Sequence, residues 1–81
     1  MRFELPNIRH LRVCRAVAQA RSVSAAAEHE HLSQPAVTQA VAKLEGALGI
    51  ALFERRAGGM ATTPMGASFL DRVDRALEHL A

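Results

Sequence analysis

The segment Ser33-Gln34-Pro35-Ala36-Val37-Thr38-Gln39 decides the fold, because it predicts a helix that begins with short polar side chains. Ser33 is a favoured N-cap residue, since its hydroxyl can accept a hydrogen bond from an unpaired amide of the first turn. Pro35 follows in that turn, where its missing N–H group costs nothing. Glutamine pairs with adenine, and threonine presents a hydroxyl and a methyl group to base edges. A helix tip of this composition is typical of a helix-turn-helix protein that reads the major groove of DNA.

The helix that starts at Ser33 is predicted to run to about Leu48, where Gly49 ends it. Apolar residues recur with helical spacing and predict one buried face, formed by Val37, Val41, Leu44 and Leu48. The opposite face is polar or small, with Gln34, Thr38, Gln39, Ala42 and Lys43.

Two shorter helices are predicted before this segment. The first runs from about Asn7, its expected N-cap, to Ala20, and the second from Ser24, its expected cap, to His31. The first helix carries an apolar stripe that predicts its buried face: Ile8, Leu11, Cys14 (or Val13), Val17 and Ala18. A second stripe is basic and is interpreted as a solvated face, with contacts to phosphates or to a neighbouring helix as the alternative: Arg9, Arg12 and Arg15.

The residues after Gly49 predict a small β-ribbon and then a last helix. The ribbon has strands at 50–55 and 60–62 around a turn at 56–59, and Thr63-Pro64 starts the last helix. The apolar positions of that helix form two overlapping stripes: Phe69, Leu70, Val73, Ala76, Leu77 and Leu80. Because a lone surface helix needs only one stripe, we expect one side to pack on this domain and the other on a second chain.

Together these elements predict a mainly α fold. It is a winged helix-turn-helix with a three-helix core and a short two-stranded wing over residues 1–63, followed by a long C-terminal helix over 64–81. The helix-turn-helix occupies about 23–42 and the wing about 50–62.

Composition narrows the possible classes of protein. The chain has 81 residues, a formal net charge of +2 and no apolar run of the roughly 20 residues that a membrane span needs. Residues 1–56 carry a net charge of +3 and residues 57–81 carry −1, so the front of the chain is the better partner for a polyanion. The single Cys14 excludes an internal disulfide and is expected to pack as a small apolar residue. The first six residues lack an apolar stretch, so we expect a cytoplasmic protein.

The region from Ser24 to Arg55 resembles the DNA-binding domain of the LysR-type transcriptional regulators. The matching residues are Ala26-Ala27-Glu28, Leu32 to Thr38, Lys43-Leu44-Glu45, Leu48-Gly49 and Leu52-Phe53-Glu54-Arg55. The later Thr63-Pro64-Met65-Gly66 is similar to the family's Thr-x-x-Gly entry to a linker helix.

This resemblance implies sequence-specific binding of double-stranded DNA by a bacterial regulator that is not an enzyme. It implies base contacts from Gln34, Pro35, Thr38 and Gln39, backbone contacts from Ser22, Ser24, Ser33 and Lys43, and a wing with Arg55 and Arg56 near the minor groove. It also implies a homodimer through the last helix, with contacts from Phe69, Leu70, Val73, Leu77 and Leu80, and a site that is an interrupted inverted repeat. The whole protein is expected to be a tetramer whose small-molecule effector binds a C-terminal domain absent from these residues, which themselves need no cofactor.

Four positions depart from the usual family pattern. Gln39 and Ala42 stand where basic residues are frequent, so adenine becomes the more favoured base at Gln39. Gly58 stands where a wing arginine is common, and Glu30 stands where a leucine is usually buried. Because burial of an unpaired carboxylate is costly, we expect Glu30 to turn outward or to pair with an arginine such as Arg15.

Other functions have weaker support in the sequence. His29 and His31 are two positions apart, whereas zinc-binding histidines on a helix are four apart, so no metal site is predicted. No serine or cysteine has a base at a recognisable catalytic spacing. The remaining alternative is a winged helix that serves as a protein-interaction or dimerisation module without DNA binding. The exposed face of the helix after Ser33 would then be apolar, whereas here it is polar.

Overall fold

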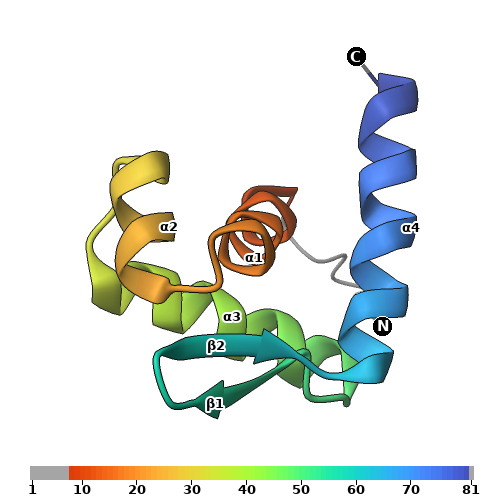
Figure 1. The fold of residues 1–81 in the computed structure, drawn as a ribbon. Helices are drawn as coiled ribbons and strands as arrows, with labels where there is room; N and C mark the ends of the chain where they lie inside the picture. The colour runs from red at the N-terminus through yellow and green to blue at the C-terminus, as the bar shows by residue number, and fades with distance from the viewer. Residues whose placement is uncertain (1–7, 81) are drawn as a thin grey trace.

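The computed structural model describes residues 8–80, which form four helices and one two-stranded antiparallel sheet (Figure 1). The elements in chain order are α1 (Ile8–Ala20), α2 (Val23–Glu30), α3 (Gln34–Leu48), β1 (Phe53–Arg56), β2 (Gly59–Thr62) and α4 (Pro64–Leu80). Helices α1, α2 and α3 pack on one another, the strands extend to one side as a wing, and α4 stands against α1 and β2. The predicted winged helix-turn-helix fold is confirmed.

Helix α1 lies at the centre of the packing, since it contacts α2, α3 and α4. The predicted N-cap Asn7 lies outside the described residues. The predicted buried stripe is partly wrong: Ile8 is 44% exposed, and Ala16 is buried instead. Because three helices surround α1, its buried sector is wider than one stripe and centres on its middle turns.

Helix α2 begins earlier than predicted. Its N-cap is Ser22 and not Ser24, because the Ser22 hydroxyl accepts a hydrogen bond from the Ala25 amide at 3.0 Å. The Ser22 carbonyl also accepts from the Ala26 amide and starts the helical ladder. Ser24 therefore lies inside the first turn, and α2 ends at His31 in the left-handed conformation.

Helix α3 has the ends that the sequence predicts. The Ser33 hydroxyl accepts from the Ala36 amide at 3.2 Å, and Gly49 ends the helix with φ +71°. The buried residues of α3 are Val37, Ala40, Val41 and Leu44, while Leu48 is half-buried against the core.

The wing is a hairpin whose register pairs Phe53 with Thr62 and Arg56 with Gly59. Its first strand starts three residues later than predicted. The Glu45 carboxylate of α3 accepts hydrogen bonds from the Leu52 and Phe53 amides at 2.7 and 3.3 Å. The segment from residue 50 to 52 is therefore a connection held by α3, and the fully buried Leu52 side chain anchors it.

A close backbone contact holds the wing against the corner between α1 and α2. The Met60 amide donates to the Arg21 carbonyl at 3.0 Å. A Cβ atom at Gly59 would collide with the same carbonyl oxygen, so only glycine allows β2 to approach this far.

Helix α4 starts at the predicted threonine and proline. The Thr63 hydroxyl accepts from the Gly66 amide at 2.9 Å and donates to the Ala51 carbonyl at 2.6 Å. A Cβ atom at Gly66 would collide with the Leu52 carbonyl, which explains why the helix needs glycine in its first turn. The Thr-x-x-Gly pattern therefore joins α4 to the connection before the wing.

Candidate nucleic-acid interface

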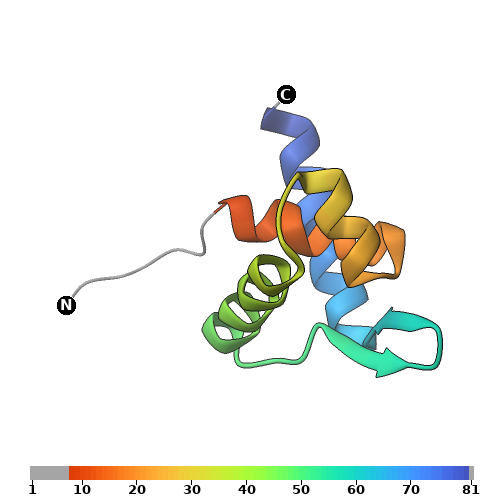
Figure 2. The same cartoon turned by 90° about the vertical axis from the view of Figure 1, so that its left-hand side faces the viewer.

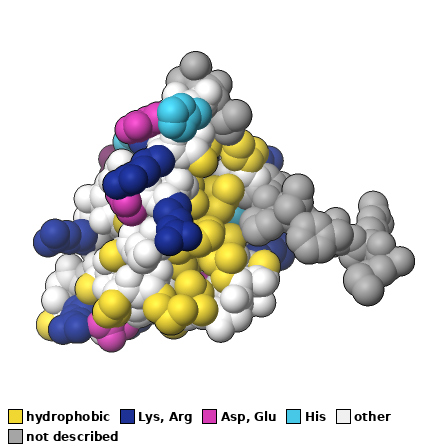
Figure 3. Space-filling view, turned by 90° about the vertical axis from the view of Figure 1, so that its right-hand side faces the viewer, with side chains coloured by type: hydrophobic (Ala, Val, Ile, Leu, Met, Phe, Trp, Pro, Cys, Tyr) yellow, Lys and Arg dark blue, Asp and Glu magenta, His cyan; other side chains and the backbone are white. Residues whose placement is uncertain are grey.

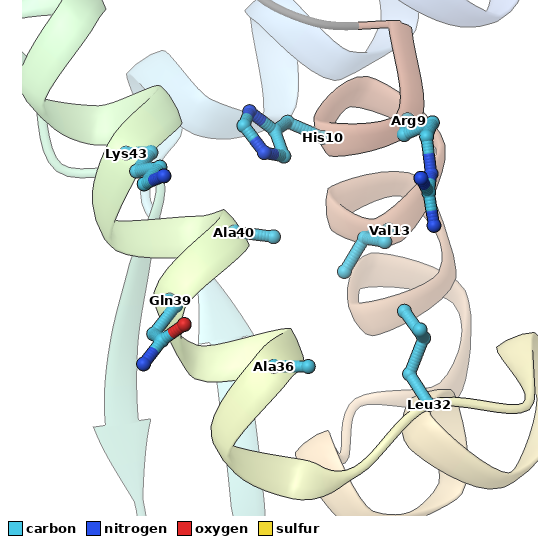
Figure 4. Close-up of a pocket in the computed structure, with 8 residues that line it drawn as sticks. All are labelled: Arg9, His10, Val13, Leu32, Ala36, Gln39, Ala40 and Lys43. Carbon is cyan, nitrogen blue, oxygen red and sulfur yellow. The ribbon is translucent and has the colours of Figure 1, made fainter.

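The N-terminal half of α3 presents polar side chains to solvent. Gln34, Pro35, Thr38 and Gln39 are all exposed, as is Lys43 one turn further on. In Figure 4, Gln39 projects from α3 away from α1, while Ala36 and Ala40 face α1. The structure thus brings all four predicted base-contact residues to one accessible helix surface.

Two of the predicted backbone-contact residues cap helices. The hydroxyls of Ser22 and Ser33 each accept an amide hydrogen bond, and each still has its O–H group to donate. Ser24 is exposed in the first turn of α2. These three hydroxyls lie at the starts of the two helices of the helix-turn-helix, where a phosphate can approach.

The predicted wing arginines lie side by side on β1 but point to opposite faces, because side chains alternate along a strand. Both are exposed. The Glu54 carboxylate accepts a hydrogen bond from Arg56 at 2.6 Å and raises the pKa of that guanidinium above its ordinary value. Among the described residues, Arg55 forms no ion pair with a carboxylate, whereas Arg56 pairs with Glu54. The sequence alone did not reveal this difference between the two arginines.

The structure divides the predicted dimer contacts of α4 into two sides. Leu70 and Val73 are buried within this chain, and Phe69 and Leu77 are half-buried. The side chain of Leu80 lies outside the described residues. Leu70 and Val73 therefore belong to the packing of α4 on its own domain and are not available to a second chain.

A different stripe of α4 carries the exposed apolar surface. Met65 is 61% exposed and Ala76 is exposed, and their spacing from Phe69 places the three on one side of the helix. Figure 3, which looks onto the α4 side, shows apolar side chains gathered over this part of the molecule. The predicted dimer contacts do not include Met65, which extends the exposed stripe into the first turn of α4.

The acidic residue Glu30 does not pair with Arg15. Its carboxylate contacts His29 at 2.9 Å with 26% of its side chain exposed, whereas Arg15 pairs with Asp74 of α4. Within residues 8–80 no group of three or more histidine, cysteine, aspartate or glutamate side chains could hold a metal ion.

Cys14 packs as a core residue, as expected. Its side chain is fully buried, and burial together with the nearby Glu45 charge raises the pKa of the thiol from 9.0 to about 12. A thiol with this pKa stays protonated at neutral pH and is a poor nucleophile.

A core of three helices, the third with an exposed polar surface, and a two-stranded wing beside it define a winged helix-turn-helix domain. The family model described as "Bacterial regulatory helix-turn-helix protein, lysR family" matches residues 8–67. The chain belongs to the LysR family and is a helix-turn-helix DNA-binding domain of that family.

Relatives of the chain are named as transcriptional regulators. Over 72 residues the chain is 49% identical to the HTH-type transcriptional regulator TfdS of Cupriavidus pinatubonensis. The matched region covers 89% of this chain and 24% of that protein. The chain therefore spans about a quarter of the length of this relative.

Two solved structures with a similar fold contain DNA. The CbnR_DBD-DNA complex has a TM-score of 0.86 and 39% identity, covering 91% of this chain and 85% of that one. The BenM_DBD/benA site 1 DNA complex has a TM-score of 0.87 and 34% identity, covering 91% and 83%. Among the residues described for this chain, no helix has the length and apolar character to cross a membrane.

Proposed function

We propose that this domain binds double-stranded DNA sequence-specifically, with α3 in the major groove and the wing at the neighbouring minor groove. The observation that carries the proposal is the exposed polar surface of α3, formed by Gln34, Thr38, Gln39 and Lys43. The DNA complexes of the CbnR and BenM domains, which share this fold, support it.

The proposed contacts divide into two kinds. Gln34, Pro35, Thr38 and Gln39 contact base edges, and the amide of Gln39 suits adenine. Ser22, Ser24, Ser33 and Lys43 contact the backbone and set the position of α3 without reading sequence. Arg55 and Arg56 of the wing lie at the minor groove, and Arg55 carries the larger share because Glu54 offsets the charge of Arg56.

A winged helix that only binds another protein is the less favoured function. The exposed surface of α3 would then be apolar, whereas its outward residues are polar or small. The apolar surface of this chain lies on α4 instead, which suits pairing between copies.

The proposed partner for the α4 surface is a second copy of the chain. A symmetric pair of domains places two α3 helices on successive major grooves, so the DNA site is an interrupted inverted repeat. We assign the contacts to Met65, Phe69 and Ala76, with the exposed part of Leu77 extending them.

The longer relatives suggest a place for the other expected properties. We propose that the small-molecule effector binds a part of the protein outside these 81 residues, that the whole protein is a tetramer, and that it acts in the cytoplasm. The domain described here supplies the DNA contacts and takes no cofactor.

Selection of bound duplexes from a random-sequence pool tests the proposed function. The expected outcome is an enriched inverted repeat, with a measured affinity that falls steeply as salt rises, since each neutralised phosphate contributes about 0.9 to the slope of log K against log salt. Failure to bind any duplex at low salt would contradict DNA binding, and enrichment of a single unrepeated site would contradict the symmetric pair.

A further inference from the structure

The connection that precedes the wing joins the end of α3 to the start of α4. On one side of it, the Glu45 carboxylate of α3 accepts hydrogen bonds from the Leu52 and Phe53 amides, both through Oε2. On the other side, Thr63 donates from its amide to the Leu52 carbonyl at 2.9 Å and from its hydroxyl to the Ala51 carbonyl at 2.6 Å. The connection is therefore held between a side chain of α3 and the residue that starts α4.

The first turn of α4 lies directly against this connection. Figure 2 shows the connection as it leaves the end of α3 and passes beside the start of α4 before it enters the wing. The approach is so close that a Cβ atom at Gly66 would collide with the Leu52 carbonyl. Helix α4 otherwise packs chiefly on α1 and β2. The connection is thus a direct link between α3 and the base of α4.

Glu45 is suited to fix the direction of this link. The buried side chains of Leu52 and Phe53 keep the connection in the core, but apolar burial is not directional. Hydrogen bonds are directional, and those to a charged acceptor are stronger than those between neutral groups. Because α4 also packs on α1 and β2, loss of the Glu45 bonds should loosen the base of α4 without detaching it.

The angle between α3 and α4 decides where the proposed base-contact residues lie. The helix between Gln34 and Glu45 is about 16 Å long, at about 1.5 Å per residue. A tilt of about 10–20° at Glu45 therefore moves Gln34 by about 3–6 Å. One base pair added between two half-sites moves them about 3.4 Å apart and turns them by about 35°, and two copies of the domain share this change.

We propose that Glu45 is a positioning residue that sets the angle between α3 and α4 and thereby the half-site spacing that a pair of domains accepts. The inference rests on the proposed function, including the pairing of two copies through α4. It adds a determinant of specificity that touches no base: the α3 surface selects the half-site, and Glu45 restricts the distance between two of them.

Binding to a series of duplexes tests this role. Each duplex carries the selected inverted repeat with its spacer unchanged or altered by one or two base pairs. The wild type should lose about tenfold in affinity when the spacer changes by one base pair, and Glu45→Ala should reduce this loss to about threefold or less. Base preference within each half-site should stay that of the wild type. A mere loss of stability would weaken binding to all spacers alike, so the ratio between spacers reports positioning.

Three further variants accompany Glu45→Ala. Glu45→Gln keeps an oxygen acceptor without the charge, so its spacer ratio should lie between those of the wild type and Glu45→Ala. Thr63→Val removes the hydroxyl on the other side of the connection and should also broaden the accepted spacing, which provides the test if Glu45→Ala does not fold. Glu54→Ala is the matched control, because Glu54 directly follows the connection and Phe53 but pairs with Arg56, and it should keep the wild-type ratio.

The outcomes separate this inference from the proposed function. If Glu45→Ala and Thr63→Val both fold and keep the wild-type ratio, the positioning role is wrong and DNA binding stands. If the wild type itself binds all spacers equally, the connection sets no spacing and the inference falls alone. If the wild type binds no duplex, both fall.

Discussion

Arg15 of α1 and Asp74 of α4 form an ion pair, with 2.6 Å between Nε and Oδ1. These two atoms are shielded from solvent, although about two fifths of each side chain is exposed. The contact does not have the alignment of a hydrogen bond, so its attraction is chiefly electrostatic. It joins the helix at the centre of the domain to the helix that carries the proposed dimer surface.

We expect this pair to couple α1 and α4 by about 0.5–1 kcal/mol, because partial exposure weakens the attraction but the contacting atoms are shielded. A double-mutant cycle of Arg15→Ala and Asp74→Ala, followed by urea unfolding, measures it. The matched control is the pair Asp71 and Arg75, which lies within α4 at 3.4 Å and is more exposed. A coupling no larger than that of the control would show that Arg15 does not hold α4.

Gly66→Ala should destabilise the domain by about 1–3 kcal/mol or more, because the added Cβ collides with the Leu52 backbone carbonyl, which cannot swing aside. Gly46→Ala is the matched control. It lies in the exposed part of α3 with nothing near its Cβ position, and it should stabilise by up to about 1 kcal/mol through higher helix propensity. Thermal and urea unfolding compare the two, and equal effects of the two substitutions would contradict the close contact of α4 with residue 52.

Stability should fall above about pH 9 because of Cys14. The thiol has a pKa of about 12 in the folded chain and about 9.0 when unfolded, so the folded state keeps a proton that the unfolded state loses between these values. The stabilisation that this thiol gives is therefore complete below pH 9. Above pH 9 the free energy of unfolding declines by up to about 1.4 kcal/mol per pH unit. Urea unfolding at several pH values measures the slope, and Cys14→Ala should remove this part of it. An identical alkaline slope in both chains would show that the thiol is not buried as described.

Gln39→Ala should relax sequence preference at one base pair by about 1–3 kcal/mol, because the side-chain amide can pair with a single adenine. Lys43→Ala is the matched comparison, since it should weaken binding to all duplexes alike. Selection from a random pool, repeated with each variant, distinguishes the two effects. An unchanged preference for Gln39→Ala would remove that residue from base recognition.

Ala76→Asp should convert a dimer into monomers, because it places a charge in the exposed apolar stripe of α4 without entering the core. Ala67→Asp is the matched control, since Ala67 is also exposed on α4 but lies on the opposite side of the helix. Sedimentation measures the oligomeric state and circular dichroism checks that both variants fold. A dimer that persists in Ala76→Asp would refute this stripe as the interface.

Local rules explain why much of the fold could be predicted. Ser33, Pro35 and Gly49 mark the ends of α3 through hydrogen bonding and backbone conformation within a few residues. The cap of α2 was misplaced because Ser22 and Ser24 satisfy the same local rule, and only the hydrogen bond to Ala25 separates them. The start of β1 was misplaced because Glu45, seven residues before Leu52, holds the connecting segment.

The sequence by itself determined the succession of helices, the hairpin and the polar surface of α3, because capping, glycine conformation and apolar periodicity act over a few neighbouring residues. Only the tertiary structure decided which side of α4 is buried, that β2 rests on the Arg21 carbonyl and that Arg15 pairs with Asp74 instead of Glu30. These contacts join residues far apart in the chain. They depend on how the helices are oriented, which local spacing does not specify.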